Sequence, residues 1–579
     1  MAHGVNELPE TFCQLAYLLL VIATQQSQNT LPGTVSISTM VKVLRNGRFL
    51  RPSGHNPKEA VFSNCLILDE SSGKILHVAS DNGGEVQSAV SSGADVIDMQ
   101  NRLVVPGFVD SHMHLLHTGE TLNKLDISGC ETLEEIRTAI RNYAKAHPDI
   151  DRILCCSWFQ TSTNGEALAS QIDDLDPRPI YIYAYDMHSM WCNTAALDEL
   201  QVADLEDPPG GTIHRDEAGK PTGLLSETAA LSIADPFLSG QLSSEQKMGF
   251  IHDAIQAYIA SGYTGLIDMA MDEKTWEIIL SYREKCGGSL PIWMAVHWFI
   301  LPQKTLDETL AQVDMAITLN KQYNEETSPD CRITGIKIMC DGVVDACTAS
   351  LMEPYSHNGG NEAAVWTLEE LVPILKKADD AGLQIAIHAI GDAAIRVAID
   401  SLQQVGNPAG RHRIEHLETC SPEDVTRLGK LGITASVQPV HSDPSILQAW
   451  PKLLGPKRCE HVFPYNGFAE HGATIAIGTD APTASHLVLP NLYTATTRRS
   501  GRKPELDEQT APGFALSLAA AMAAATQGAA YSCFADDRVG RLEPGKAANL
   551  AIIDVVWDPA RLLEGKVQQT WYQGRKIYG

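Results

Sequence analysis

Eight apolar runs of strand length, separated by segments with helical patterns, constrain the fold of this chain more than any other feature of its sequence. Continuous apolar runs bounded by turn residues are typical of parallel strands that are buried on both faces. Between the runs, Thr367 with Glu370 forms a capping-box pattern, and Ser421-Pro422 places proline at the first position of a helix. Strands that alternate with helices in this way predict an α/β fold, a (β/α)8 TIM barrel. The runs are residues 103–112, 264–269, 291–299, 333–340, 383–388, 413–416, 433–438 and 474–480.

The predicted barrel spans residues 103–535. Three regions of the chain do not show its alternation of strands and helices. Residues 36–102 contain short strand-like runs between turn residues, and residues 536–579 do so again. We expect these two ends of the chain to form one small β-sandwich-like domain. The third region, at about 117–245, includes the sequence Pro-Pro-Gly-Gly at 208–211. We interpret it as an insertion after the first barrel strand, in a position to cover the barrel mouth.

Charge and composition restrict the partners. The formal net charge is −27, from 44 basic and 71 acidic residues, and no basic run reverses this locally. Such a surface repels phosphate backbones, so we expect no nucleic-acid partner. With 44% hydrophobic and 20% charged residues, the composition is that of a soluble globular protein. We expect a small-molecule substrate, and the sequence leaves a homo-oligomer open.

The first 35 residues are expected to be a leader, either disordered or signal-like. Their apolar run, residues 15–23, is too short to cross a bilayer as a helix, so we expect no stable membrane span. The ten residues at the start contain no Lys or Arg, unlike the start of a secretory signal. We therefore expect a cytoplasmic protein, with secretion as the alternative that the apolar run leaves open.

The motif with the clearest chemical meaning is His112-Met113-His114, at the end of the first predicted barrel strand. Alternate side chains of a strand point to the same face, so both imidazoles can converge on one cation. Functional residues of a (β/α)8 barrel collect at the C-terminal ends of its strands, where this pair lies. Two histidines at this spacing arise by chance in many chains, and it is the position at a strand end that indicates a metal site.

The residues around this pair resemble the opening motif of the amidohydrolase superfamily. Further short matches follow in the order found in amidohydrolase family 3, and together they extend from about residue 37 to residue 579. The matching segments are PGFVDSHMH at 106–114, DMHS at 186–189, GGTI at 210–213, GIK at 335–337, DG at 341–342, IHAIGD at 387–392, HRIEH at 412–416, GTD at 478–480 and GRLEPGKAANL at 540–550.

The resemblance implies a site for one or two divalent cations, with zinc as the expected metal. The implied ligands are His112, His114 and Asp480 for the first cation, and His388 and His416 for the second. Imidazole and carboxylate groups suit Zn²⁺. Two adjacent cations also need a bridging anion, so Lys337 would bridge them as a carboxylated lysine. With a single cation, an unmodified Lys337 with another role is the alternative.

The resemblance further implies that Asp480 is catalytic. Besides binding the cation, Asp480 would accept a proton from cation-bound water, whose pKa the cation lowers toward about 7. The resulting hydroxide would attack a carbonyl carbon, and Asp480 would pass the proton to the leaving nitrogen. Asp110 is expected to orient a histidine ligand from behind. His412 lies on the same strand face as His416 and is expected to have a similar or a purely structural role.

Four residues in or beside the insertion are candidate substrate contacts, although a structural role suits each of them equally well. They are His188, Trp191, Trp158 and His214. The chain also departs from the family pattern after GTD, where Ala481 replaces an aromatic residue. The smaller side chain predicts a larger pocket beside the metal.

We therefore expect a metal-dependent hydrolase that cleaves a carbon–nitrogen bond other than a peptide bond. Its substrate would be an amide, an N-acyl or N-formyl amine, or a cyclic amide. Similarity of fold does not settle which bond is cleaved, so ester or lactone hydrolysis and decarboxylation at the same metal site are alternatives. A non-catalytic binding protein on the same fold is a further hypothesis, and the intact set of ligands argues against it.

Overall fold

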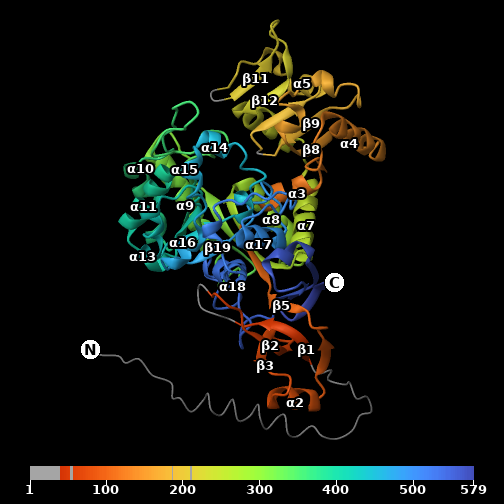
Figure 1. Cartoon of the computed structure of the whole chain (residues 1–579), viewed down its shortest axis with the longest axis vertical. Helices are drawn as coiled ribbons and strands as arrows, with labels where there is room; N and C mark the ends of the chain where they lie inside the picture. Colours follow the sequence, from red (N-terminus) through yellow and green to blue (C-terminus); the bar gives the residue numbers. More distant parts are fainter. Residues whose placement is uncertain (1–39, 52–56, 186, 209–210) are drawn as a thin grey trace, which may run out of the picture. The chain divides into compact units, whose positions relative to one another are not determined.

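The computed structural model describes residues 40–579, apart from residues 52–56, 186 and 209–210. The expected leader therefore lies outside the described residues, as do Asp186 and Gly210 of the insertion motifs. Within the described part of the chain, strands form three sheets, whose elements are labelled in Figure 1. None of the helices described there is long and apolar enough to cross a membrane.

The eight predicted runs form the parallel strands of a (β/α)8 barrel, which confirms this part of the predicted fold. Each strand pairs in parallel with the next one along the chain. Nearly all of their residues are buried, which explains why the runs are apolar throughout. The strands are β6 (Phe108–Met113), β13 (Tyr263–Met271), β14 (Trp293–Phe299), β15 (Cys331–Met339), β16 (Gln384–Ala389), β17 (Arg413–His416), β18 (Thr434–Val437) and β19 (Ile475–Ile477).

The first predicted run is two strands rather than one, and this corrects the expectation. β5 (Leu103–Pro106) belongs to a different sheet, and Gly107 separates it from β6. A Cβ atom at Gly107 would lie 2.3 Å from Oγ1 of Thr264, so the chain can turn here only without a side chain. Both strands are apolar and buried, and for this reason the pattern of hydrophobicity does not separate them.

Backbone hydrogen bonds join the first and last strands where the barrel closes. The amide of Asp480 donates to the carbonyl of His112 at 2.7 Å, and the amide of His114 donates to the carbonyl of Ala481 at 2.9 Å. Gly478 allows this approach, because a Cβ atom there would lie 2.5 Å from the amide nitrogen of His112. The closure brings the ends of β6 and β19 together.

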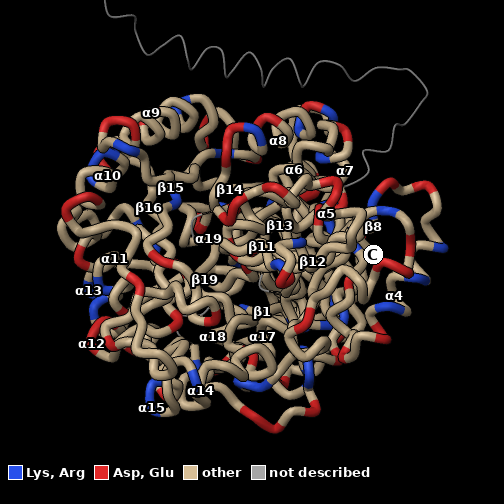
Figure 2. The backbone as a smooth tube through the Cα atoms, turned by 90° about the horizontal axis from the view of Figure 1, so that it is seen from above, with Lys and Arg blue, Asp and Glu red and all other residues tan. Residues whose placement is uncertain are grey.

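The helices of the barrel are α3 (Leu115–Leu122), α7 (Ser244–Ala260), α8 (Glu273–Lys285), α9 (Leu306–Gln322), α10 (Leu368–Asp380), α11 (Asp392–Val405), α12 (Pro422–Val425), α13 (Leu428–Leu431), α14 (Trp450–Leu453), α15 (Pro456–Cys459), α16 (Tyr465–Glu470), α17 (Val488–Thr497), α18 (Leu518–Ala523) and α19 (Ala529–Tyr531). Figure 2 shows α8 to α11 around the outside of the strands that they connect. Both predicted helix starts are confirmed. Thr367 and Glu370 form a capping box at α10, and Ser421 caps α12 with Pro422 at its first position.

Strands from both ends of the chain form one sheet, in the order β22-β21-β20-β5-β1-β2-β3, with β4 paired to β1. The junction is the antiparallel pair of β20 and β5, where Ile552 lies opposite Val104. The sandwich-like packing and the domain boundaries expected from the sequence stay predictions. The strands are β1 (Val41–Leu50), β2 (Phe62–Asp69), β3 (Lys74–Ala79), β4 (Asp95–Asp98), β20 (Leu550–Asp554), β21 (Lys566–Tyr572) and β22 (Arg575–Tyr578), and one helix, α2 (Gly84–Ser91), lies between β3 and β4.

The third sheet lies between β6 and β13 in sequence, within the predicted insertion, and has its own hydrophobic core on each face. Alternate residues of β9 point to opposite faces, so Tyr181 packs in one core and Ile182 in the other. The strand order is β11-β12-β10-β9-β8-β7. The elements are β7 (Leu125–Asp126), α4 (Leu133–Ala146), β8 (Ile153–Trp158), β9 (Ile180–Ala184), β10 (Ser189–Cys192), α5 (Thr194–Leu200), β11 (Gly211–Arg215), β12 (Pro221–Glu227) and α6 (Asp235–Gly240).

Candidate metal centre and active site

Two histidines and an aspartate from three different strand ends converge at one end of the barrel. His112 comes from β6, His416 ends β17, and Asp480 follows β19. One possible ligand atom from each residue, an imidazole nitrogen or a carboxylate oxygen, lies within 4.8 Å of the other two. The Oδ1 atom of Asp480 lies 3.3 Å from Nε2 of His112 and 3.2 Å from Nε2 of His114. The structure therefore brings together all three residues that the resemblance assigned to the first cation, and one assigned to the second.

His388 and Lys337 border this cluster. The ring centroids of His388 and His416 are 4.4 Å apart. Burial lowers the pKa of His388 to about 3, so its imidazole is neutral near pH 7 and has a lone pair for a cation. Lys337 is only 1% exposed in the middle of the barrel. Burial lowers its pKa to about 8, although the carboxylates of Glu415 and Asp480 oppose the shift.

Glu415, which the sequence analysis did not select, orients the ring of His112. Its Oε2 atom lies 2.7 Å from Nδ1 of His112, and its Oε1 atom accepts a hydrogen bond from Nε of Arg413 at 2.5 Å. All three side chains are buried. Burial alone would raise the pKa of Glu415. The charge of Arg413 and the hydrogen bond from His112 outweigh this effect and hold that pKa well below its usual value. The carboxylate thus fixes one nitrogen of His112 and leaves the other to face Asp480.

Asp110 acts on the backbone rather than on an imidazole. Its carboxylate accepts hydrogen bonds from the amide of His112 at 3.2 Å, and from the amide and hydroxyl of Thr479 at 3.0 and 2.6 Å. Burial raises the pKa of Asp110 to about 7, although these bonds oppose the shift. Asp110 therefore ties the end of β6 to the residue before Asp480.

His441 and Glu418 lie beside the cluster, and the sequence analysis selected neither. Nδ1 of His441 lies 3.2 Å from Oε1 of Glu418, and Nε2 lies 3.7 Å from Oδ2 of Asp480. The rings of His441 and His416 are stacked, with centroids 5.8 Å apart. A ligand-capable group is also formed by His416, Glu418 and His441. Only their place beyond the ends of β17 and β18 could have indicated them in the sequence.

The side chains of this cluster fit a divalent cation. Nδ1 of His416 has no hydrogen-bond partner among the described residues, and the side chain is buried. A buried polar atom without a partner is costly unless a ligand occupies it. His416 and Asp480 also have positive φ angles of 72° and 57°, which residues other than glycine rarely adopt. Such strain gathers at functional sites.

The other predicted site residues lie outside the cluster. His412 precedes β17, at the opposite end of that strand from His416, and its Nε2 lies 3.1 Å from Oδ1 of Asp379. Trp158 and Trp191 are buried in the insertion, with ring centroids 5.4 Å apart. His188 lies 2.8 Å from Glu227, which is a charged pair only if the imidazole is protonated. His214 contacts the hydroxyl of Ser226 at 3.0 Å.

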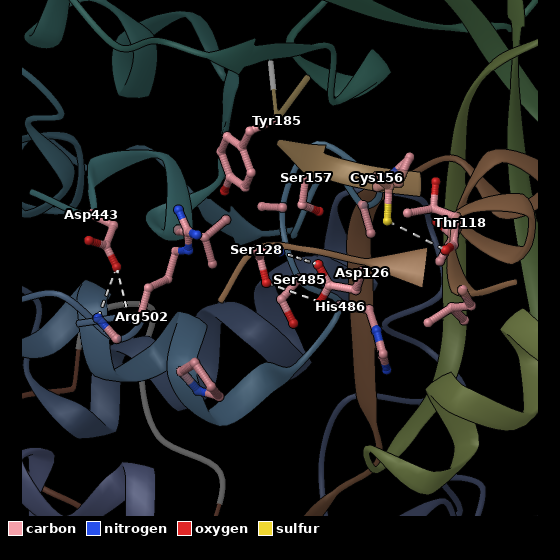
Figure 3. A pocket seen from close by; sticks show the side chains of 18 of the residues that line it. Thr118, Asp126, Ser128, Cys156, Ser157, Tyr185, Asp443, Ser485, His486 and Arg502 are labelled. Atoms are coloured by element: carbon pink, nitrogen blue, oxygen red, sulfur yellow. Dashed lines mark hydrogen bonds between the residues drawn. The ribbon is translucent and has the colours of Figure 1, made fainter. Parts of the chain in front are cut away.

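A pocket of about 360 Å³, drawn in Figure 3, has in its wall Ala481, the residue that follows Asp480 in the sequence. Ala481 and Pro482 form part of its wall, as do residues of α3, of the insertion and of the loops around α17. Its volume lies within the usual range for small-molecule sites. The small Ala481 side chain lines this pocket, and Tyr185 of the insertion forms another part of the wall.

The profile of the amidohydrolase family matches residues 95–578, and thus most of the chain. The chain belongs to the amidohydrolase family. This membership confirms the resemblance seen in the sequence motifs. Active sites of (β/α)8 barrel enzymes lie at the C-terminal strand ends, which is where the cluster lies.

Relatives of this amidohydrolase are found in several organisms. The protein LONG AFTER FAR-RED 3 of Arabidopsis thaliana is 29% identical over 522 residues, which cover 87% of each chain. An N-substituted formamide deformylase of Arthrobacter pascens is 24% identical and covers 86% of this chain and 91% of its own. A solved structure of an uncharacterized metal-dependent hydrolase from Pyrococcus horikoshii has a TM-score of 0.70 at 25% identity and covers 90% of this chain and 98% of its own.

Proposed function

We propose that this amidohydrolase hydrolyses a carbon–nitrogen bond other than a peptide bond, in an amide, an N-acyl or N-formyl amine, or a cyclic amide. The observation that carries the proposal is the convergence of His112, His416 and Asp480, with ligand atoms within 4.8 Å of one another. A divalent cation at this point, with zinc as the first candidate, would polarise a carbonyl group and lower the pKa of water toward about 7.

We propose two sets of ligands, one for each cation. The first cation would be bound by His112, His114 and Asp480, and the second by His388 and His416. The lowered pKa of Lys337, about 8, makes its neutral amine available near physiological pH. Only a neutral amine reacts with carbon dioxide, so this supports a carboxylated Lys337 between two cations. One cation with an unmodified Lys337 is the alternative.

Asp480 has the contacts that proton transfer requires. Burial alone would raise the pKa of Asp480. The charge of His112 and the hydrogen bonds from His112 and His114 outweigh this effect and hold that pKa well below its usual value. Its carboxylate is therefore ionised and can accept a proton from the attacking water. We propose that Asp480 then donates this proton to the leaving nitrogen. Ala481, the next residue in the sequence, lines the pocket, and we propose that a substrate reaches Asp480 from there.

The name of one relative supports the proposal of hydrolysis at a nitrogen. The Arthrobacter pascens relative is named an N-substituted formamide deformylase, and a formamide is one of the proposed substrates. Ester or lactone hydrolysis and decarboxylation need the same polarised carbonyl, and a binding protein needs only the pocket. We also propose that His188, Trp191, Trp158 and His214 influence substrate binding through the insertion, and that the protein is cytoplasmic.

A panel of substrates tests the proposed bond. The protein is loaded with zinc or manganese in the presence of bicarbonate and offered an N-alkyl formamide, a cyclic amide, an ester, a lactone and a carboxylic acid. We expect turnover of a formamide or an amide at values of kcat/KM on the order of 10⁴ M⁻¹s⁻¹ for its preferred substrate. Turnover of the ester or lactone alone would replace the proposal by its first alternative. If the metal-loaded protein turned over none of these compounds, the result would favour the alternative of a non-catalytic binding protein.

A further inference from the structure

Arg502 stands out among the residues that line the pocket beside Asp480. Its Cζ atom lies 4.5 Å from the ring centroid of Phe159 and 4.5 Å from that of Tyr185. These two rings are stacked, with centroids 4.6 Å apart and planes 24° apart. Figure 3 shows Arg502 extending toward Tyr185 along the wall of the pocket. The guanidinium therefore has an aromatic support from the insertion, while its backbone belongs to a loop of the barrel.

The loop of Arg502 is held in place without the guanidinium. Oδ2 of Asp443 accepts hydrogen bonds from the amide of Gly501 at 2.9 Å and from the amide of Arg502 at 3.3 Å. Oδ1 of the same carboxylate accepts from the amide of Ser445 at 2.9 Å. The neighbouring Lys503 pairs with Glu131 of the insertion at 2.9 Å. These contacts hold the loop in addition to those that the guanidinium makes with Phe159 and Tyr185.

The charge of Arg502 has no counter-ion in the protein as far as the structure describes it. The aromatic contacts of its guanidinium are not accompanied by an ion pair with any carboxylate of the described residues. Lys124, the other cation of the lining, lies 3.7 Å from the ring centroid of Tyr183, and the charges of Glu120 and Asp235 act on it. In a chain of net charge −27, the exposed guanidinium of Arg502 thus forms no ion pair among the described residues, although Asp126 and Asp443 also line the pocket.

We propose that Arg502 binds a carboxylate at the end of the substrate remote from the bond that is cleaved. The pocket between Ala481 and Arg502 would hold the part of the substrate that joins the two ends. The planar guanidinium matches a carboxylate in two parallel hydrogen bonds, and the aromatic rings restrict its orientation beforehand. This inference rests on the proposed function, because it takes the reacting bond to lie at Asp480. It assigns the substrate to acidic N-acyl or N-formyl amines.

Pairs of substrates that differ only in charge test the inference. The probes are N-formyl ω-amino acids, in which an increasing number of methylene groups separates the formamide from the carboxylate. Each acid is compared with its neutral analogue, in which a primary amide replaces the carboxylate. The ratio of kcat/KM for acid and amide is measured in the natural protein, in Arg502→Gln and in Arg499→Gln. Arg499 is the matched control, because it belongs to the same loop, pairs with Asp507 at 3.5 Å and does not line the pocket.

We expect the natural protein and Arg499→Gln to prefer the acid by about tenfold or more at the best chain length, through KM. In Arg502→Gln this preference should fall to about one. A merely structural role of Arg502 would lower the values for acid and amide together and leave their ratio unchanged, and that result would overturn the inference. A natural protein that prefers the neutral amide would overturn it as well.

Equilibrium binding separates this inference from the proposed function. Calorimetry with the same acid and amide on metal-loaded Asp480→Asn, with and without Arg502→Gln, measures recognition without turnover. Tighter binding of the acid that disappears with Arg502→Gln supports the role of Arg502 even where the natural protein cleaves no formamide. Equal binding of acid and amide to Asp480→Asn refutes it even where the natural protein is an active deformylase.

Discussion

Asp480→Asn is expected to lower kcat by on the order of a thousandfold while the protein stays folded. Asparagine has nearly the same shape, but it cannot accept the proton from the attacking water and it offers a cation a weaker oxygen. The substituted side chain lies at the centre of the site, where Oδ1 is 3.2 Å from Nε2 of His114 and Oδ2 is 3.7 Å from Nε2 of His441. Steady-state kinetics on the best substrate of the panel measure the effect, and thermal unfolding confirms that the fold is intact.

Asp507→Asn is the control for this substitution. Asp507 is a fully exposed aspartate that pairs with Arg499 at 3.5 Å, so its neutralisation should leave kcat within about twofold. An Asp480→Asn protein that keeps more than about a tenth of the natural kcat, with metal bound, would contradict the proposed proton transfer. A loss of bound metal together with kcat would assign the effect to the ligand role of Asp480.

Glu415→Gln should have the second large effect, on stability and on metal affinity together. The substitution leaves the buried guanidinium of Arg413 without its carboxylate partner, and the loss of one member of a buried ion pair costs about 3–5 kcal/mol. It also weakens the contact that orients His112, at 2.7 Å. Loss of such a partner lowers metal affinity by roughly 10- to 100-fold. Urea unfolding and a competition titration with a chelator measure the two effects.

Glu423→Gln serves as the matched control, because Glu423 pairs with Arg396 at 2.9 Å while its side chain is 72% exposed. We expect it to change the free energy of unfolding by less than about 0.5 kcal/mol. If Glu415→Gln behaves like this control in both measurements, the buried network is not what supports the cluster.

The barrel could be predicted because its strands are buried on both faces, which makes each of them a continuous apolar run. The same property hid the boundary at Gly107, since β5 and β6 are equally apolar although they belong to different sheets. The pairing of β5 with β20 joins residues more than 400 positions apart, and nothing local in either segment indicates its partner. Short-range patterns thus reveal strands but not the sheet that each one joins.

The cluster was predicted to the extent that its members belong to short motifs. His112 and His114 share one such motif, and Asp480 ends another, so order along the chain was enough to select them. Glu415 lies inside the motif HRIEH, but the pattern of the motif marks its two histidines as candidate ligands and gives no separate role to the carboxylate. A carboxylate in a buried strand needs a partner, and that requirement was the available signal. His441 lies in an irregular segment, where only the closed barrel brings it to Asp480.

The tryptophans show how the same residue type supports two interpretations. Trp158 and Trp191 were candidates for substrate contact because they lie in the insertion, and the structure buries both in its core. Each belongs to a strand, β8 or β10, in which large side chains pack between sheet and helix. Arg502 gave no signal of its own, because an arginine in a polar loop is ordinary until the loop is placed beside the pocket.

The metal content of the purified protein tests the central claim most directly. Elemental analysis is made after incubation with zinc or manganese and bicarbonate, on the natural protein, on His112→Ala/His114→Ala and on the exposed control His461→Ala. We predict about one or about two tightly bound divalent cations per chain in the natural protein and the control, and their loss from the double variant. About two would also support a carboxylated Lys337. No bound cation in the natural protein, or equal amounts in all three proteins, would contradict the account.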